Sequence, residues 1–304
     1  MSNFGIPYQG SKDILVHKLA AILPKADNLY DLFGGGFSVS HYMHLFGDYK
    51  TVHYNELEPS TVELVKDAIA GKYNYKSFKP EWITRQMFHA RKQNCAYTRI
   101  VWSFGNNQNT YIFGKNIEEY KRSLHQAVVF SEFNKLAIDT LGLSKWPDHL
   151  SIRGRRLLCR NQVFKKNGGQ RGDKQLEQLK QFQQLQQLER LEQLQQLQHL
   201  QRLERLQRLQ QLEPLTMTSL SYEQVQIKPN SIIYCDPPYK NTFGYTKSFD
   251  HDSFWQWVRS CPHPVYVSEY SAPDDIKTIA AFRHSKTNSK TTTQSVEKLF
   301  WNGV

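Results

Sequence analysis

Apolar and polar positions alternate along the N-terminal part of the chain in a way that predicts helices and strands in turn. Residues 13–23 have helical spacing, residues 28–33 form a short apolar stretch that ends at glycines, and residues 41–46 suit another helix. Residues 52–55 and 60–70 repeat this pattern as a strand and a helix. After an initial helix, the predicted order is therefore strand, helix, strand, helix.

Three apolar stretches near the C-terminus predict further strands. Residues 231–235 and 265–268 have the composition of buried strands, and residues 296–301 that of an outer strand. Together with the N-terminal pattern, they predict an α/β fold with a mostly parallel sheet covered by helices, in which ligands lie at the carboxyl ends of the strands. Residues 71–174 break the alternation and are rich in aromatic and basic residues, which indicates a second, largely helical domain inserted into the first.

Residues 176–215 form a repeat in which an apolar residue, usually leucine, occupies every third position. An α-helix turns about 100° per residue, so this stripe moves by roughly 60° at each step and does not make a heptad coiled coil. A long 3₁₀-helix or a stacked solenoid would align it. Two interpretations stay open: an element for self-association or spacing and, preferred, an expanded low-complexity insertion without chemistry.

The composition indicates a folded protein with a substantial core, because 39% of residues are hydrophobic and 13% aromatic. No apolar run is long enough to span a membrane and the N-terminus does not resemble a secretion signal, so we expect a cytoplasmic protein. The four cysteines form no CxxC pair and no histidine stands in a ligand pattern. Neither a disulfide framework nor a metal site is expected.

The charge of the chain changes this picture, because a formal net charge of +11 favours a polyanionic partner. Between Arg153 and Lys174, eight basic residues accompany a single acid, Asp173. We interpret this tract as a surface that contacts phosphates, with a solvated basic loop as the alternative. Its candidate phosphate contacts are Arg153, Arg155, Arg156 and Arg160.

The first candidate site is the sequence YDLFGGGFS, which follows the first predicted strand. Asp31 and Phe33 end the strand, and Gly34 and Gly36 belong to a loop that allows a ligand to approach the backbone closely. Glu56 ends the next strand at a spacing that suits a carboxylate binding both hydroxyls of a ribose. The loop matches neither GxGxxG nor GxxxxGK[ST], which argues against a dinucleotide or nucleoside triphosphate site.

The second candidate site is the sequence DPPY, which directly follows the apolar strand SIIYC. Pro237 and Pro238 fix the backbone and lack N–H donors, so the loop offers carbonyl oxygens that only accept hydrogen bonds. Asp236 adds a carboxylate and Tyr239 a ring for stacking. This combination predicts a receptor for an aromatic amine.

In the order of these motifs, the chain resembles the Dam-like N6-adenine-specific DNA methyltransferases of the D12 class. YQGSK resembles the N-terminal motif of that family, which places an aromatic ring and a lysine, here Tyr8 and Lys12, at the S-adenosylmethionine site. SLSYEQV resembles the stretch before the catalytic strand, so that Ser221 and Tyr222 become candidates beside the adenine of the cofactor. VYVSEYSAP resembles the strand and loop that follow the catalytic motif.

The resemblance implies a Rossmann-like S-adenosylmethionine-dependent methyltransferase sheet over residues 1–70 and 216–304. Residues 71–174 would form an inserted, mostly helical DNA target-recognition domain, and residues 175–215 a Leu/Gln-rich insertion outside the family core. S-adenosylmethionine is the implied cofactor and duplex DNA the implied partner, with no metal and no membrane. The implied cofactor-binding residues are Tyr8, Lys12, Asp31, Phe33, Gly34, Gly36, Glu56, Ser221, Tyr222 and Asp236.

The implied reaction is methyl transfer to N6 of adenine in a specific site of duplex DNA. Asp236 and the carbonyl of Pro237 would accept hydrogen bonds from the amine and hold it in line with the methyl group. The target nucleotide would leave the duplex and stack on Tyr239, with Pro238 completing the loop. In the inserted domain, Arg99, Asn106, Asn107 and Gln108 are candidates near base edges, and a packed turn is the alternative for this cluster.

Three rival functions remain at this point. The same motif serves methylation of RNA adenine or of cytosine N4, although Asp at its first position favours adenine by family resemblance. A DNA-binding relic without activity is a second rival, and an oligomerising protein built around the leucine repeat is a third. The third predicts that deletion of residues 176–212 abolishes function, whereas a methyltransferase is expected to keep its activity.

Overall fold

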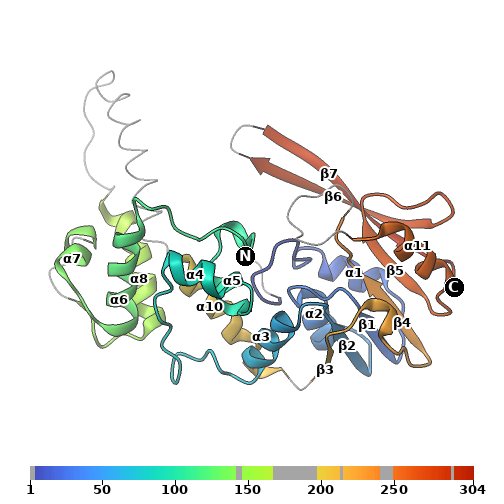
Figure 1. Cartoon of the computed structure of the whole chain (residues 1–304), viewed down its shortest axis with the longest axis horizontal. Coiled ribbons are helices and arrows are strands. Elements are labelled where there is room, and N and C mark those ends of the chain that lie inside the picture. Colours follow the sequence, from blue (N-terminus) through green and yellow to red (C-terminus); the bar gives the residue numbers. More distant parts are fainter. Residues whose placement is uncertain (1–3, 142–145, 167–196, 213–214, 240–248, 289–290) are drawn as a thin grey trace. The chain divides into compact units, whose positions relative to one another are not determined.

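The computed structural model describes most of the chain, namely residues 4–141, 146–166, 197–212, 215–239, 249–288 and 291–304. The chain folds as two compact units (Figure 1). Unit 1 comprises Met1–Ala70 with Arg208–Val304, and unit 2 comprises Gly71–Gln207. Among the described residues, no helix is long and apolar enough to cross a membrane.

A seven-stranded sheet forms the centre of unit 1, with the strand order β3-β2-β1-β4-β5-β7-β6 (Figure 1). Strands β1 to β5 are parallel, and β7 is antiparallel to both of its neighbours. In the register, Leu29 pairs with Val52 on one side and Ile232 on the other, so the carboxyl ends of β1, β2 and β4 meet at one edge. The strands are β1 (Asn28–Asp31), β2 (Thr51–Asn55), β3 (Thr216–Thr218), β4 (Ser231–Cys235), β5 (Val265–Glu269), β6 (Lys277–Asn288) and β7 (Thr291–Trp301).

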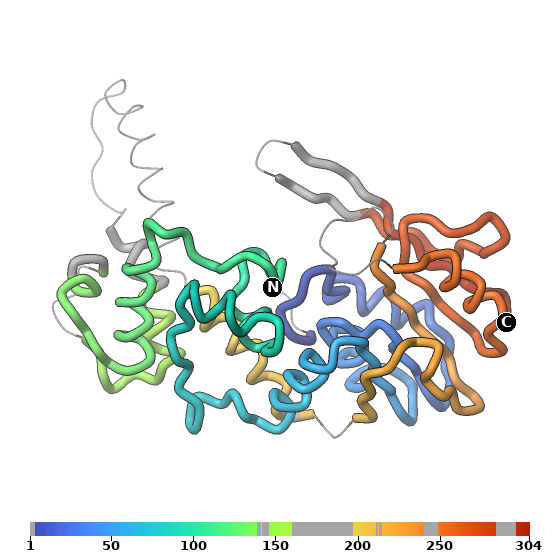
Figure 2. The backbone as a smooth tube through the Cα atoms, viewed as in Figure 1, coloured from blue at the N-terminus to red at the C-terminus, as the bar shows by residue number. Residues whose placement is uncertain are grey.

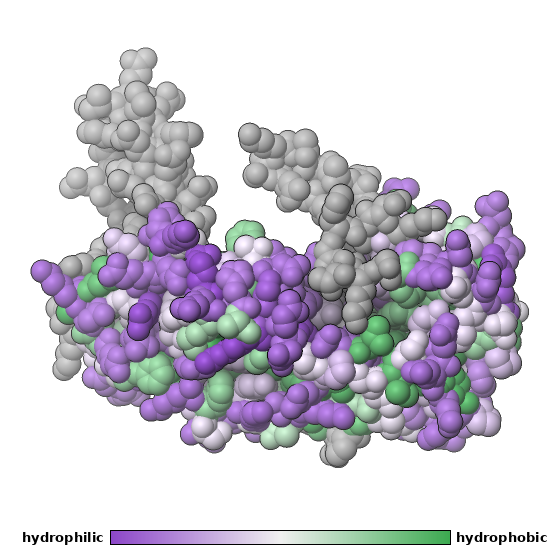
Figure 3. Space-filling view, in the orientation of Figure 1, coloured by the Kyte–Doolittle hydropathy of each residue, from purple (hydrophilic) through white to green (hydrophobic). Residues whose placement is uncertain are grey.

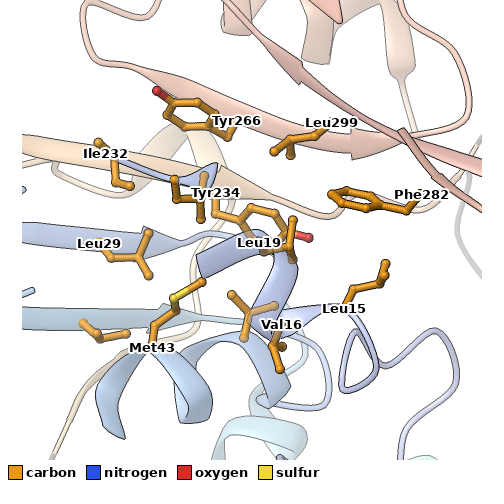
Figure 4. Close-up of a cluster of buried hydrophobic side chains, with 13 residues drawn as sticks. Leu15, Val16, Leu19, Leu29, Met43, Ile232, Tyr234, Tyr266, Phe282 and Leu299 are labelled. Carbon is orange, nitrogen blue, oxygen red and sulfur yellow. The ribbon is translucent and has the colours of Figure 1, made fainter. Parts of the chain in front are cut away.

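Both faces of this sheet are covered, because successive side chains of each strand point to opposite faces. On one face, Leu29 and Ile232 pack against Leu19 and Met43 (Figure 4). On the other face, the next residue of each strand joins a second cluster around Phe254. The helices of unit 1 are α1 (Val16–Ile22), α2 (Ser38–Phe46), α3 (Pro59–Ile69) and α11 (His251–Ser260), with 3₁₀ turns η2 (Arg208–Gln211) and η3 (Tyr222–Gln224).

The expected α/β fold with a mostly parallel sheet is confirmed. The prediction of a strand at residues 296–301 is confirmed as part of β7, but its predicted outer position is wrong, because β7 lies between β5 and β6. The outer position belongs to β6, whose sequence KTIAAFRHSKTN lacks a regular alternation and therefore gave no signal. The short edge strand β3 was not predicted either, since three residues are too few to show a period.

The described part of unit 2 consists of helices and loops, with one isolated β-bridge between Ser103 and Tyr111. The helices bury a core of their own, in which Leu124 and Val128 of α6 pack against Leu200 of α10. The helices are α4 (Arg85–Arg91), α5 (Ala96–Val101), α6 (Glu118–Phe130), α7 (Lys135–Leu141), α8 (Ile152–Lys166) and α10 (Gln198–Gln207), with the 3₁₀ turn η1 (Phe104–Asn106).

The end of the leucine repeat is part of the packed structure. Helix α10 contacts α5 in unit 2, and Figure 2 shows its path in yellow. The α-helix changes to a 3₁₀ turn at Arg208, where three residues per turn match the step of the repeat. In this part of the repeat, the fully buried leucines are Leu200, Leu203, Leu206 and Leu209.

This packing changes how the repeat is interpreted. A deletion of residues 176–212 would remove α10 and its buried leucines, so the expectation that methyl transfer survives such a deletion needs correction. Residues 176–196 of the repeat lie outside the described residues. Self-association through the repeat, one of the two open interpretations, therefore stays untested.

Candidate active site

The glycine loop after β1 is bound to the end of β2. Gly34 N donates to Asn55 O at 2.8 Å, and Gly35 N donates to Glu56 Oε2 at 2.9 Å. The hydroxyl of Tyr54 donates to Gly35 O at 2.9 Å. A Cβ atom on Gly34 would lie 2.2 Å from the buried Tyr54 ring, so only glycine permits this close approach. The loop thereby orients the Glu56 carboxylate at the carboxyl end of the sheet.

The N-terminal segment packs directly on the same loop. Ile6 N donates to Gly36 O at 2.8 Å, and Lys12 N donates to Ser38 Oγ at 3.2 Å. A Cβ atom on Gly36 would lie 2.4 Å from Cβ of Tyr8. These contacts place the side chains of Tyr8 and Lys12 at the ends of β1 and β4, although they precede the first helix.

Asp236 follows β4 and belongs to a largely buried ionic cluster around Lys12. Its Oδ2 lies 2.7 Å from Lys12 Nζ, and Lys12 Nζ lies 3.6 Å from Glu297 Oε1 of β7. The same ammonium lies 4.8 Å from the centre of the Tyr239 ring, which packs edge-on against Tyr270. The pKa of Asp236 is raised to about 6, because burial and, to a smaller extent, the charge of Glu297 raise it more than Lys12 and Tyr239 lower it.

Asp31 places a second buried carboxylate beside this cluster. Its Oδ2 accepts hydrogen bonds from Ser40 N at 3.2 Å and Ser40 Oγ at 2.7 Å. Its Oδ1 is buried without a hydrogen-bond partner among the described residues. Desolvation raises the pKa of Asp31 to about 7, and the negative charges of Asp236 and Glu56 add to the effect, which the Ser40 hydrogen bonds oppose. The site therefore carries a negative field.

Phe33 and Tyr222 form an aromatic pair next to the glycine loop. Their ring centres are 5.4 Å apart in a stacked arrangement, and Phe33 also packs edge-on against Phe254. Ser221 forms a capping box at the start of η3, which fixes the backbone on which Tyr222 stands. Both rings are partly exposed, so they present an apolar surface to a ligand.

The predicted catalytic and cofactor-binding residues thus come from separate parts of unit 1 to one edge of its sheet. Sequence reasoning missed Glu297, Ser40 and Tyr270. Glu297 gave one usable signal, because it is a lone acid in the apolar stretch VEKLFW and its side chain is only 8% exposed. Ser40 and Tyr270 gave none, since their roles depend on contacts with Asp31 and Tyr239.

The candidate base-contacting residues of unit 2 lie in and beside one polar loop closed by the bridge between Ser103 and Tyr111. Arg99 Nε donates to Gln108 Oε1 at 2.9 Å. Asn107 Oδ1 accepts from the backbone N–H groups of Asn109 and Thr110, at 3.0 and 2.9 Å. Asn106 has a positive φ of 61°, and its Oδ1 is buried. These hydrogen bonds give the loop a defined shape, as expected if the cluster is a packed turn.

Two of the four arginines predicted to contact phosphates have structural roles instead. Arg155 is buried and donates to Val128 O at 2.7 Å at the end of α6. Arg156 is buried in a two-bond pair with Glu204, at 2.7 and 2.6 Å. Both guanidinium groups are used inside unit 2, so their assignment as phosphate contacts is corrected.

The other two arginines of that prediction differ from each other. Arg153 is exposed on α8 and stays a candidate, whereas the side chain of Arg160 lies outside the described part of the structure. Hydrophilic residues cover much of the face of unit 2 in Figure 3. Among the described residues, no group of three His, Cys, Asp or Glu side chains could hold a metal ion.

Comparison with protein families accounts for this arrangement. The model of the D12 class N6 adenine-specific DNA methyltransferases matches residues 8–277, from Tyr8 to the start of β6. No curated protein matches the chain. The mostly parallel seven-stranded sheet is consistent with a Rossmann-like methyltransferase fold. Because the match extends over most of its length, the chain belongs to the D12 class of N6 adenine-specific DNA methyltransferases.

Proposed function

We propose that this protein transfers a methyl group from S-adenosylmethionine to N6 of adenine in a specific site of duplex DNA, after the target nucleotide has left the helix. The observation that carries the proposal is the Asp236 carboxylate of the DPPY loop, which is 18% exposed and lies 2.7 Å from Lys12 Nζ beside the glycine loop. A buried carboxylate next to backbone acceptors suits an amine donor, which is the chemistry of adenine N6.

The residues at the edge of the sheet fit S-adenosylmethionine. Asp31 Oδ1 is buried and has no hydrogen-bond partner among the described residues, so it can accept from a bound ligand. Glu56 is oriented by the Gly35 amide at the position of a ribose-binding acid. The carboxylates of Asp31, Glu56 and Asp236 suit a cation, and the bound cofactor supplies a methyl group on a sulfonium. The residues proposed to hold it are Tyr8, Lys12, Asp31, Phe33, Gly34, Gly36, Glu56, Ser221, Tyr222 and Asp236.

Asp236 and Pro237 are proposed to act on the amine. The lone pair of an exocyclic amine is conjugated into the base, so hydrogen bonds to Asp236 and to the Pro237 carbonyl draw the nitrogen toward tetrahedral geometry. With a pKa of about 6, Asp236 is largely ionised at pH 7 and accepts such a bond. Tyr239, supported edge-on by Tyr270, offers a ring on which the base stacks.

Unit 2 is proposed to recognise the DNA target. The exposed Arg153 supplies a positive charge for phosphate, and the loop after Arg99 supplies polar groups for base edges. Phe104 in this loop is 62% exposed, and Gly105 beside it has open space around its Cα. An exposed apolar side chain in a polar loop can enter the base stack and fill the gap that an extruded nucleotide leaves.

Sequencing with detection of methylated bases tests the proposal. A host without its own methylases would express the chain or its Asp236→Ala variant, and its genomic DNA would be sequenced. We expect N6-methyladenine in a defined motif with the natural chain and none with the variant. N4-methylcytosine, or methylation confined to RNA in an assay with labelled S-adenosylmethionine, would support the corresponding rival and contradict the proposal.

A further inference from the structure

We propose that Glu297 is a positioning residue for methyl transfer. Glu297 shares Lys12 with Asp236 and thereby keeps Asp236 a strong acceptor for the N6 amine. This inference rests on the proposed function and names a residue on β7 that lies beyond the matched part of the chain. It concerns a carboxylate that contacts Lys12 and Tyr239 at the site.

The strand register explains how Glu297 reaches the site. Side chains alternate along β7, so Glu297 lies on the same face as Leu299, which packs with Leu15 and Val16 at the start of α1. Lys12 lies just before this helix. The apolar face shared by α1 and β7 therefore ends at an ion pair between Lys12 and Glu297.

Lys12 is held between two carboxylates at unequal distances. Its Nζ lies 2.7 Å from Asp236 Oδ2 and 3.6 Å from Glu297 Oε1, and it donates to Gly10 O at 3.5 Å. Glu297 also interacts with the Tyr239 hydroxyl. An ammonium group has three donors, so these partners fix the position of Lys12 without committing it to Asp236 alone.

Because Glu297 is buried, its negative charge acts on Asp236 with little screening by water. The side chains of Lys12 and Glu297 are 7% and 8% exposed, so water screens their interaction only weakly. A glutamate is costly at such a position in a strand, where an apolar residue would pack without loss of solvation. A functional role accounts for the presence of this carboxylate.

Two opposite effects set the strength of Asp236 as an acceptor. Lys12 favours the ionised form of the carboxyl and weakens it as a base, whereas the negative charge of Glu297 acts in the opposite direction. Neutral glutamine at position 297 would leave Lys12 to pair with Asp236 alone, in competition with the N6 amine. The described titratable groups that face Asp236 are Lys12, Asp31, Tyr234, Cys235, Tyr239 and Glu297.

Kinetics of purified full-length Glu297→Gln and Glu297→Asp test this inference over a range of pH with duplex DNA. For Glu297→Gln we expect kcat to fall roughly tenfold at its plateau, the acid limb of kcat/KM to move to lower pH, and KM for DNA to stay unchanged. Glu297→Asp keeps the charge and should keep the acid limb of the natural chain. The matched control is Glu63→Gln, at an exposed position of α3, which should leave both parameters unchanged.

The outcomes separate this inference from the proposed function. Failure of the natural chain to methylate adenine in DNA would overturn the proposed function, and the inference with it. An active natural chain whose Glu297→Gln variant keeps both its kcat and its acid limb would overturn the inference alone. If Glu297→Gln does not fold, Glu297→Asp becomes the test. A shifted acid limb of kcat/KM in Glu297→Asp would then contradict the sharing of Lys12.

Discussion

Lys12 Nζ lies 2.7 Å from Asp236 Oδ2, which joins the N-terminal YQGSK motif to the DPPY loop through one largely buried ion pair. The two motifs are far apart in the sequence, yet each is incomplete without the other. The DPPY loop places the carboxylate at the end of β4, and the segment before α1 supplies the cation that keeps this carboxylate ionised near neutral pH.

Replacement of Lys12 by methionine should therefore move the pH dependence of the reaction upward. Lys12 lowers the pKa of Asp236 below the value that burial would give, so Lys12→Met raises this pKa above about 6. The acid limb of kcat/KM should move to higher pH, and activity at pH 7 should fall at least tenfold. This shift is opposite in sign to that expected for Glu297→Gln.

A pH profile with duplex DNA measures the effect of Lys12→Met. The matched control is Lys25→Met, because Lys25 also pairs with an aspartate, Asp48, but both side chains are mostly exposed. The control should leave the profile unchanged. An acid limb that stays in place in Lys12→Met would show that Lys12 does not govern the charge of Asp236.

Truncation of Phe104 should impair catalysis on intact duplexes more than on duplexes with a weakened target pair. If Phe104 fills the gap in the base stack, Phe104→Ala loses part of the free energy that offsets unstacking, which amounts to a few kcal/mol. We expect a fall of roughly tenfold to a hundredfold in kcat/KM with paired DNA, and a smaller fall with a mismatch opposite the target adenine. Equal losses on both substrates would exclude a role in base extrusion.

Much of unit 1 was predictable because several of its strands are short, apolar and followed directly by the candidate site residues. The stretch SIIYC gave β4 with its bounds, and the next residue is Asp236. The β6–β7 hairpin was missed in part because β6 carries polar residues at irregular intervals. Glu297 was missed for a different reason, since its partner Lys12 is remote in the sequence and is identified only in the folded chain.

The sequence was least informative where a charged residue has a structural role. Arg155 and Arg156 have the composition of a phosphate-binding tract, but their burial depends on α6 and α10, which are remote in the sequence. Net charge shows that a chain suits a polyanion, and it does not show which of its cations face solvent. The leucine repeat poses the same problem, because the burial of its last leucines, from Leu200 to Leu209, depends on segments that are remote in the sequence.

Removal of the Glu204 charge should destabilise unit 2. Glu204 and Arg156 form two bonds, and their side chains are 11% and 10% exposed, so Glu204→Gln leaves a buried guanidinium without its counter-charge. Such a change costs about 3 kcal/mol of unfolding free energy. Urea unfolding of the full chain measures it, with Glu81→Gln as the control, because the pair of Glu81 with Arg91 is exposed and contributes below about 1 kcal/mol. Equal effects of the two substitutions would contradict the structural role of α10.

Replacement of Asp31 by asparagine should weaken cofactor binding and increase the stability of the folded chain. The pKa of Asp31 rises from 3.8 to about 7 on folding, so the folded chain binds this proton more tightly than the unfolded chain. The contribution of Asp31 to stability is therefore present below pH 3.8 and is lost as pH rises through about 7. Asparagine removes this loss, so Asp31→Asn should gain about 1–3 kcal/mol relative to the natural chain between pH 4 and pH 8.

Urea unfolding at pH 4 and pH 8 measures this relative gain, and calorimetry measures the binding of S-adenosylmethionine. Binding should weaken at least tenfold, because asparagine removes a negative charge from the carboxylates proposed to face the sulfonium. Asp48→Asn serves as the control, since it also replaces an aspartate by asparagine but at an exposed position outside the site, and it should leave cofactor binding unchanged. A stability difference between Asp31→Asn and the natural chain that is the same at both pH values would show that Asp31 is not held in the folded chain with a raised pKa. Unchanged cofactor binding would remove Asp31 from the proposed cofactor site.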